Sequence, residues 1–215
     1  PFACRETELT ATPAAVRKRV AVVGAGPAGL ACAATAAERG HAVTLYDASP
    51  VIGGQLNLAR RIPGKEEFTE TLRYFDHRLA TFGVERQLSR RPTADDLRDA
   101  DAVIVATGVV PRQPTLDGIT HPSVASYVDV IEGRRDVGRN VAIIGAGGIG
   151  FDVAEFLTHG GGDDGHASDG ALHDPAITVF RDEWGIDATY ALPGGVKPAA
   201  EPAPPRNVWL LQRKS

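Results

Sequence analysis

The stretch VAVVGAGPAGLACAATAAERGHAVTLYDA, residues 20–48, decides the fold of this chain. The apolar run Val20–Val23 predicts a short buried strand that ends in glycines. An alanine-rich helix is predicted to follow from Pro27, with Gly40 as its C-terminal cap. Residues 42–48 then predict a second strand. A strand, a tight turn, a helix and a strand form one βαβ unit, so the chain is predicted to be α/β.

The glycines of this turn follow the pattern G-x-G-x-x-G at Gly24, Gly26 and Gly29. The first glycine permits a tight bend, the second lets a pyrophosphate approach the backbone, and the third lets the helix pack closely on the strand. Asp47 stands 18 residues after Gly29, where a carboxylate accepts hydrogen bonds from a ribose. We therefore predict a dinucleotide site; the alternative is a glycine turn of purely steric origin.

A second fingerprint occurs in VAIIGAGGIGFDVAEFL, residues 141–157, at Gly145, Gly147 and Gly150. It begins another strand, turn and helix, although no acid follows at an equally clear strand end. The sequence therefore predicts two Rossmann-like dinucleotide-binding units in one α/β chain.

The coenzyme at the second turn depends on which segment closes its βαβ unit. If AITVF at residues 176–180 is the strand, the pair Arg181–Asp182 follows, and the acid favours NADH. If NVWLLQ at residues 207–212 is the strand, Arg213–Lys214 follows, and two cations suit the 2′-phosphate of NADPH. We favour the second assignment; the alternative for these cations is a basic strand end in solvent.

Elsewhere the chain gives weaker patterns. They predict an extended loop at 49–68, a helix at about 66–82, a strand within 83–90, a short helix at 93–100 with Thr93 as N-cap, a strand within 101–114 and one short helix within 121–138.

Composition excludes several classes of protein. The 215 residues carry a formal net charge of -4, which gives no indication of nucleic-acid binding. No apolar run approaches the roughly 20 residues of a membrane span, so a cytoplasmic protein without membrane contact is expected. Cys4 and Cys32 form no C-x-x-C, and Cys32 is expected to pack in a core. The histidines and aspartates of residues 159–174 are interpreted as a solvated loop, so no metal site is predicted.

The two ends of the chain suggest a longer parent. The chain begins at Pro1, contains no methionine and ends soon after the second fingerprint. We interpret it as a piece of a longer protein, in which both dinucleotide-binding units are incomplete.

Two fingerprints, with GGQ at 53–55 and ATG at 106–108 between them, resemble the flavoprotein family with two dinucleotide-binding domains. In that family the first site binds FAD, the second binds NAD(P)H, and the second domain is inserted within the first. The thioredoxin reductase branch carries a C-x-x-C before the second fingerprint, which this sequence lacks. The resemblance implies a linker at 1–18, the first half of an FAD domain at 19–138, and the start of an NADPH domain at 139–215 with an insertion at about 159–206.

Longer stretches are similar to the bacterial 2,4-dienoyl-CoA reductase family of unsaturated fatty acid β-oxidation. They include IGGQLNLARRIPGKEEFTETLRYF, ATGVVPR, EWGID and LLQRK, and the resemblance extends from about Ala3 to Lys214. It implies an N-terminal TIM barrel with FMN and the dienoyl-CoA site, a 4Fe-4S cluster, and electron transfer from NADPH through FAD to FMN. The resemblance places the catalytic groups in the barrel, outside this chain, so no catalytic residue is predicted within it. Cys4 matches a family cysteine that follows the last cluster ligand.

Carried over position by position, the resemblance implies a set of cofactor contacts. Those for FAD are Gly24, Ala25, Gly26, Pro27, Ala28 and Gly29 at the pyrophosphate, Asp47 at the ribose, and Gly54, Gln55, Lys65, Pro92, Ala106, Thr107 and Gly108 elsewhere along the cofactor. Those for NADPH are Gly145, Gly147, Gly148, Ile149, Gly150, Arg213 and Lys214. Pro92 should lie near the adenine, and it has no N–H to donate at a position where the family usually has valine.

Two other functions stay open at the level of the sequence. Another electron-input module of the same build, such as the glutamate synthase small subunit or a trimethylamine dehydrogenase relative, would share both fingerprints. A non-catalytic module would hold FAD or ADP only structurally. The second fingerprint and Arg213–Lys214 argue against that non-catalytic module.

Overall fold

The computed structural model describes residues 4–5, 7–159, 175–200 and 204–212. The chain divides into two compact units, Pro1–Glu132 and Gly133–Ser215. Both units contain parallel strands and helices, so the chain is α/β as the sequence predicts.

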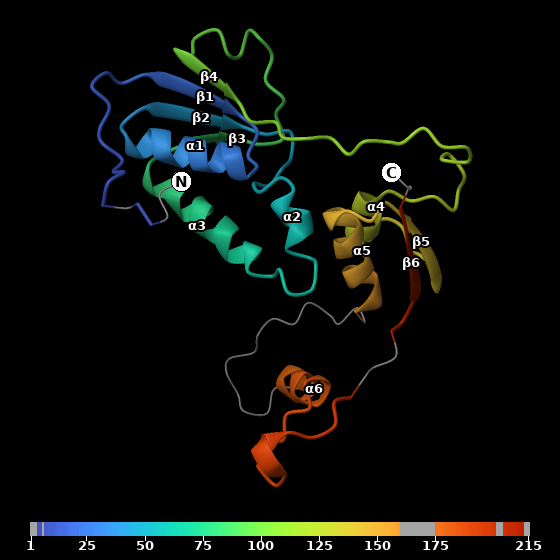
Figure 1. Cartoon of the computed structure of the whole chain (residues 1–215). Helices are drawn as coiled ribbons and strands as arrows, with labels where there is room; N and C mark the ends of the chain where they lie inside the picture. Colours follow the sequence, from blue (N-terminus) through green and yellow to red (C-terminus); the bar gives the residue numbers. More distant parts are fainter. Residues whose placement is uncertain (1–3, 6, 160–174, 201–203, 213–215) are drawn as a thin grey trace. The chain divides into compact units, whose positions relative to one another are not determined.

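The first unit is built on a four-stranded parallel sheet with the strand order β3-β2-β1-β4 (Figure 1). Its strands are β1 (Arg19–Val23), β2 (Ala42–Tyr46), β3 (Glu85–Gln87) and β4 (Ala102–Val105). Its helices are α1 (Pro27–Glu38), α2 (Leu56–Ala59), α3 (Phe68–Thr81) and α4 (Tyr127–Ile131). Because the strands are parallel, their carboxyl ends share one edge of the sheet, which is where ligands bind in such folds.

The core of the first unit lies between one face of this sheet and the helices α1 and α3 (Figure 1). Val22 and Leu45 of the sheet and Leu30 and Leu79 of the helices are fully buried. Burying a side chain of this size contributes about 1.5–3 kcal/mol. Cys32 packs against the same cluster, and burial raises the pKa of its thiol, which agrees with a packing role.

The second unit repeats the order of strand, turn and helix on a smaller scale. It contains β5 (Asn140–Ile144), α5 (Gly148–Thr158), α6 (Pro175–Glu183), a 3₁₀ turn at Pro193–Gly195 and β6 (Asn207–Leu211). β5 and β6 pair in parallel over their whole lengths. The prediction that NVWLLQ closes the second βαβ unit is therefore confirmed.

The competing strand assignment is wrong. AITVF lies in helix α6, which begins at Pro175. Proline is favoured at the first position of a helix, because its missing N–H would have no partner there and its φ is already helical. A run of apolar and β-branched residues fits a strand and a helix equally well, and here it forms a helix.

Two further local predictions are corrected. Residues 49–68 are not extended throughout, because they contain the four-residue helix α2. Residues 93–100 form turns instead of a short helix. Asp96 Oδ2 accepts hydrogen bonds from Thr93 N–H at 2.8 Å and from Thr93 Oγ1 at 2.9 Å. Such side-chain bonds offer the backbone an alternative to helix formation.

In the described part of the chain, no helix has the length and apolar composition that crossing a bilayer would require.

Candidate functional site

The first glycine turn joins the end of β1 to the first residue of α1. Gly24 has a φ of +109°, a conformation that residues with a Cβ rarely adopt, and a Cβ there would lie 2.2 Å from the Ala106 carbonyl oxygen. A Cβ on Gly29 would lie 1.8 Å from the Gly24 carbonyl oxygen. By contrast, nothing lies within 4 Å of the Cβ position of Gly26, so space is open at the N-terminus of α1. The N–H groups and partial positive charge of that helix end favour a phosphate.

Asp47 stands beside this turn, one residue after β2. Its Oδ2 accepts a hydrogen bond from Ala25 N–H at 2.5 Å, and its Oδ1 accepts one from Ser49 N–H at 2.7 Å. A carboxylate has about four acceptor positions, so Asp47 keeps capacity for ribose hydroxyls while it fixes the turn. The acid therefore has a structural task that its position in the sequence did not indicate.

The GGQ segment packs against the turn from the other side. Gly53 N–H donates to the Ala25 carbonyl oxygen at 2.8 Å. A Cβ on Gly54, whose φ is +52°, would lie 3.0 Å from Gly26 Cα. The two glycine-rich segments thus approach each other backbone to backbone.

The ATG segment follows β4 and joins the same cluster. Ala106 N–H donates to the carbonyl oxygen of the last residue of β1 at 2.7 Å. Gln55 Nε2 donates to the Val109 carbonyl oxygen at 3.1 Å, which ties the GGQ segment to the chain after ATG. Thr107 and Gly108 are exposed beside these contacts. The fold therefore gathers three segments, distant in sequence, around one helix N-terminus.

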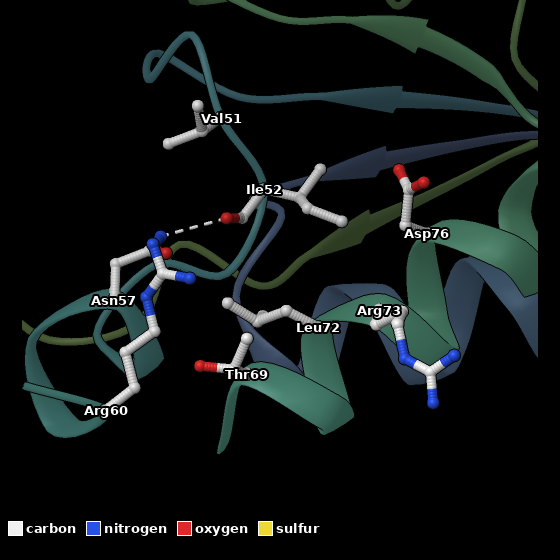
Figure 2. A pocket seen from close by; sticks show the side chains of 8 residues that line it. All are labelled: Val51, Ile52, Asn57, Arg60, Thr69, Leu72, Arg73 and Asp76. Carbon is white, nitrogen blue, oxygen red and sulfur yellow. Dashed lines mark hydrogen bonds between the residues drawn. The ribbon is translucent and has the colours of Figure 1, made fainter. Parts of the chain in front are cut away.

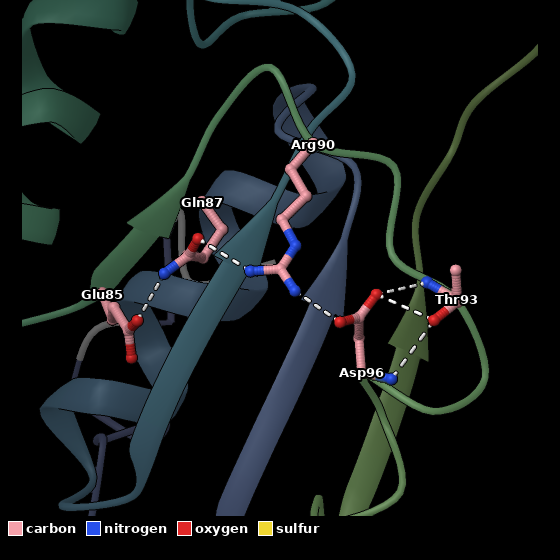
Figure 3. A network of polar contacts seen from close by, with 5 residues as sticks. All are labelled: Glu85, Gln87, Arg90, Thr93 and Asp96. Carbon is pink, nitrogen blue, oxygen red and sulfur yellow. Dashed lines mark hydrogen bonds and ion pairs between the residues drawn. The ribbon is translucent and has the colours of Figure 1, made fainter.

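Pro92 lies in the segment between Arg90 and Thr93, two residues that belong to a network of polar contacts (Figure 3). Arg90 N–H donates to the backbone oxygen of Asp47 at 2.8 Å, so the chain that leads to Pro92 runs beside Asp47. The Arg90 guanidinium donates to Asp96, which also holds Thr93. The hydrogen bond from the Thr93 backbone is the main cause that lowers the pKa of Asp96. This network orders the segment next to Asp47.

Three predicted cofactor residues stand apart from these contacts. Lys65 lies half-buried in the turn between α2 and α3, where its N–H donates to the Ile62 carbonyl oxygen at 3.0 Å. Arg213 and Lys214 lie outside the described residues. The roles of all three stay predictions. The histidine-rich segment 160–174 also lies outside, and within the described ranges no group of three or more His, Cys, Asp or Glu could hold a metal.

The second glycine turn reproduces the geometry of the first. Gly145 has a φ of +121°, and its N–H donates to the Leu211 carbonyl oxygen at 2.8 Å. A Cβ on Gly150 would lie 1.9 Å from the Gly145 carbonyl oxygen. Three predicted coenzyme residues are exposed at the N-terminus of α5: Gly147, Gly148 and Ile149.

The strand register identifies a position that sequence reasoning missed. In the first unit, Asp47 follows the last residue of β2 that pairs with β1. In the second unit, Gln212 follows the last residue of β6 that pairs with β5. Gln212 therefore occupies in the second unit the place of Asp47 in the first. An amide carries no charge, so it does not repel a phosphate there. The sequence could have indicated Gln212 only if the C-terminal end of β6 had been known, because the position is defined by its distance from that strand end.

Comparison with known proteins agrees with this geometry. The model of the family described as pyridine nucleotide-disulphide oxidoreductase matches residues 18–168, a range that includes both glycine turns. The chain belongs to this family.

Individual relatives are similar over about three quarters of the chain. A metal reductase of Desulforamulus reducens is 36% identical over 163 residues, which cover 73% of this chain and 24% of that protein. A cinnamate reductase of Clostridium sporogenes is 34% identical over 168 residues, which cover 75% and 24%. A solved structure of 2-naphthoyl-CoA reductase is 35% identical with a TM-score of 0.69, covering 74% and 24%. The chain thus spans about a quarter of the length of the curated relatives.

Proposed function

We propose that the chain is the part of a flavoprotein that passes reducing equivalents from NADPH to FAD, with FAD at the first turn and NADPH at the second. The family match and the relatives support a flavin-dependent NAD(P)H oxidoreductase module. Bound FAD would supply the exchange between hydride transfer and single-electron transfer.

One observation carries the proposal: the same glycine turn is built twice, and the residue after its closing strand differs. At the first turn, the space beside Gly26 fits a pyrophosphate, and Asp47 is placed to accept from the adenosine ribose. At the second, Gln212 takes that place and is followed by Arg213 and Lys214. A neutral residue and two cations favour a ribose that carries a 2′-phosphate.

The individual residues at the first turn would divide the work. The N–H groups at the start of α1 would bind the pyrophosphate, and the absence of a Cβ on Gly26 would let it approach. Gln55 and Ala106 would hold the GGQ and ATG segments against the turn, as their hydrogen bonds indicate.

The activity of the longer protein is proposed to be NADPH-dependent reduction of 2,4-dienoyl-CoA in the cytoplasm, with FMN, a 4Fe-4S cluster and the substrate held by a barrel outside this chain. The motifs IPGKEEF and EWGID support it. So do relatives whose names state reduction of an unsaturated acid and of an aromatic acyl-CoA, the cinnamate and 2-naphthoyl-CoA reductases.

Two measurements test the proposal. FAD titrated into the longer protein depleted of FAD should bind at one site, and NADPH should reduce that flavin at least about tenfold more efficiently than NADH, a difference of about 1.4 kcal/mol. In the longer protein, NADPH oxidation should follow 2,4-dienoyl-CoA in preference to cinnamate or 2-naphthoyl-CoA. A longer protein that does not bind FAD would refute the module, whereas preference for another of these substrates would refute only the assigned substrate.

A further inference from the structure

A pocket of about 310 Å³ lies between residues 51–60 and helix α3 (Figure 2). Its apolar lining comes from Val51, Ile52 and Leu72, and its polar lining includes Asn57 and Arg60. The volume lies at the lower end of the range of about 300–1,000 Å³ for small-molecule sites, so a ligand there would be short.

The pocket lies on the opposite side of the GGQ segment from the glycine turn. Gly53 is the dividing wall: its N–H donates to Ala25 of the turn at 2.8 Å. On its other side, a Cβ would lie 2.8 Å from Leu72 Cδ2 and 2.8 Å from Asn57 Nδ2, two residues that line the pocket. Asn57 Nδ2 also donates to the Ile52 carbonyl oxygen at 2.9 Å, as Figure 2 shows. Gly53 is therefore held from both sides, and the pocket is an open depression on the side of Gly53 that faces away from the glycine turn.

The charges around the pocket leave one cation uncompensated. Arg73 is paired with Glu70 at 2.5 Å, and Asp76 is paired with Arg86 at 2.6 Å. Across the residues that the structure describes, the half-buried Arg60 has no ion pair or side-chain hydrogen bond.

We propose that this pocket binds a small monocarboxylate with a short apolar tail. The planar guanidinium of Arg60 matches a carboxylate in geometry and compensates its single charge. The hydroxyl of Thr69, which also lines the pocket, supplies a further donor. Val51, Ile52 and Leu72 would receive the tail, which inorganic phosphate lacks. The site does not depend on the function proposed for the glycine turns.

Butyrate is the probe that tests this assignment. In the 215-residue chain, butyrate should shift the methyl resonances of Ile52 and Leu72 saturably, with a Kd on the order of 1 mM, as expected for so small a ligand. Arg60→Gln should weaken this binding at least about tenfold, because a charge-assisted hydrogen bond is lost. Arg73→Gln is the matched control: it removes an arginine that Glu70 already neutralises, and it should change the Kd less than about twofold.

Each of the following results would overturn the proposal. Butyrate could cause no saturable shift, it could bind Arg60→Gln as well as the original chain, or butylammonium could bind as well as butyrate. Inorganic phosphate that matches butyrate, or shifts confined to the amides of Gly26 and Gly147, would place the anion elsewhere and also refute the site. The methyl spectrum of each variant reports whether it is folded.

Discussion

The two glycine turns have the same geometry in different surroundings. A Cβ would meet a backbone oxygen at 1.8 Å at Gly29 and at 1.9 Å at Gly150. Yet Gly24 is buried at the end of a four-stranded sheet, whereas Gly145 is exposed at the end of a sheet of two described strands. Trp209 on β6 is 53% exposed, although the strands of the first unit hold fully buried residues.

This difference shows that the geometry of a glycine turn and the packing around it have separate causes. The glycine spacing sets the turn by itself, because the same spacing gives the same close approaches in both units. The packing around the turn does not follow from the glycine spacing. Nor does the identity of the residue after the closing strand. We therefore expect the units to differ in stability and in ligand preference more than in turn geometry.

The largest effect is expected from adding a methyl group at the third glycine of each fingerprint. Gly29→Ala should destabilise the first unit by about 3 kcal/mol, because its buried turn cannot shift to relieve the contact. Gly150→Ala should cost about 1–2 kcal/mol, since its exposed turn can relax. Amide hydrogen exchange of β1 and β5 resolves the two units.

The matched control for these variants is Gly26→Ala, where no atom lies within 4 Å of the added group. It should change stability by less than about 1 kcal/mol. Equal losses of stability in Gly29→Ala and Gly150→Ala would show that the packing around a glycine turn does not change the cost of the added methyl group.

The second effect concerns the residue after the closing strand in the first unit. Asp47→Ala should weaken FAD binding by about 1.5–3 kcal/mol through lost charge-assisted hydrogen bonds. Gln212→Ala should leave FAD affinity unchanged. FAD titration measures both, and urea unfolding of Asp47→Ala reports the separate loss of its bonds to Ala25 and Ser49. If FAD affinity stays the same in Asp47→Ala, the acid does not bind the cofactor.

A smaller effect is expected from giving the second unit the acid of the first. Gln212→Asp should shift preference from NADPH toward NADH by about tenfold, or about 1.4 kcal/mol, because a carboxylate repels a 2′-phosphate and accepts from a 2′-hydroxyl. Steady-state flavin reduction with each coenzyme measures the ratio. Gln212→Asn is the control of similar size and should keep the original ratio. A ratio that Gln212→Asp does not move would refute the register argument.

The smallest effect is the pH dependence of two turn acids, one in each unit. The backbone hydrogen bond from Thr93 lowers the pKa of Asp96, and the side-chain hydrogen bond from Thr189 lowers that of Asp187. An unfolded Asp titrates near 3.9. Below that value the unfolded state binds more protons, so the stabilisation by each acid is present above it and is lost as the pH falls through the lower folded pKa.

Asp96→Asn and Asp187→Asn should each reduce the loss of stability on acidification. Urea midpoints of both variants, followed by probes in each unit below about pH 4, test the expectation. Each substitution should act on its own unit only. A variant as acid-sensitive as the original chain would show that its aspartate does not contribute.

The sequence predicted the structure correctly where residues close together in the chain determine the local conformation. The segment 20–48 forms the strand, turn, helix and strand that its pattern predicts. The sequence left AITVF open as an alternative strand, because a run of apolar and β-branched residues fits a strand or a buried helix equally well. It also missed the second role of Asp47, because the hydrogen bond to Ala25 joins residues 22 positions apart.

The sequence alone determined that the chain has two glycine turns of one geometry, because only glycine suits the φ angles of Gly24 and Gly145 and the lack of room for a Cβ at Gly29 and Gly150. The tertiary structure decided between the two candidate strands that could complete the second turn. β6 pairs with β5 across more than 60 intervening residues, and such pairing depends on burial and hydrogen bonds between segments that no local period encodes. That pairing puts Gln212 where the first unit has Asp47.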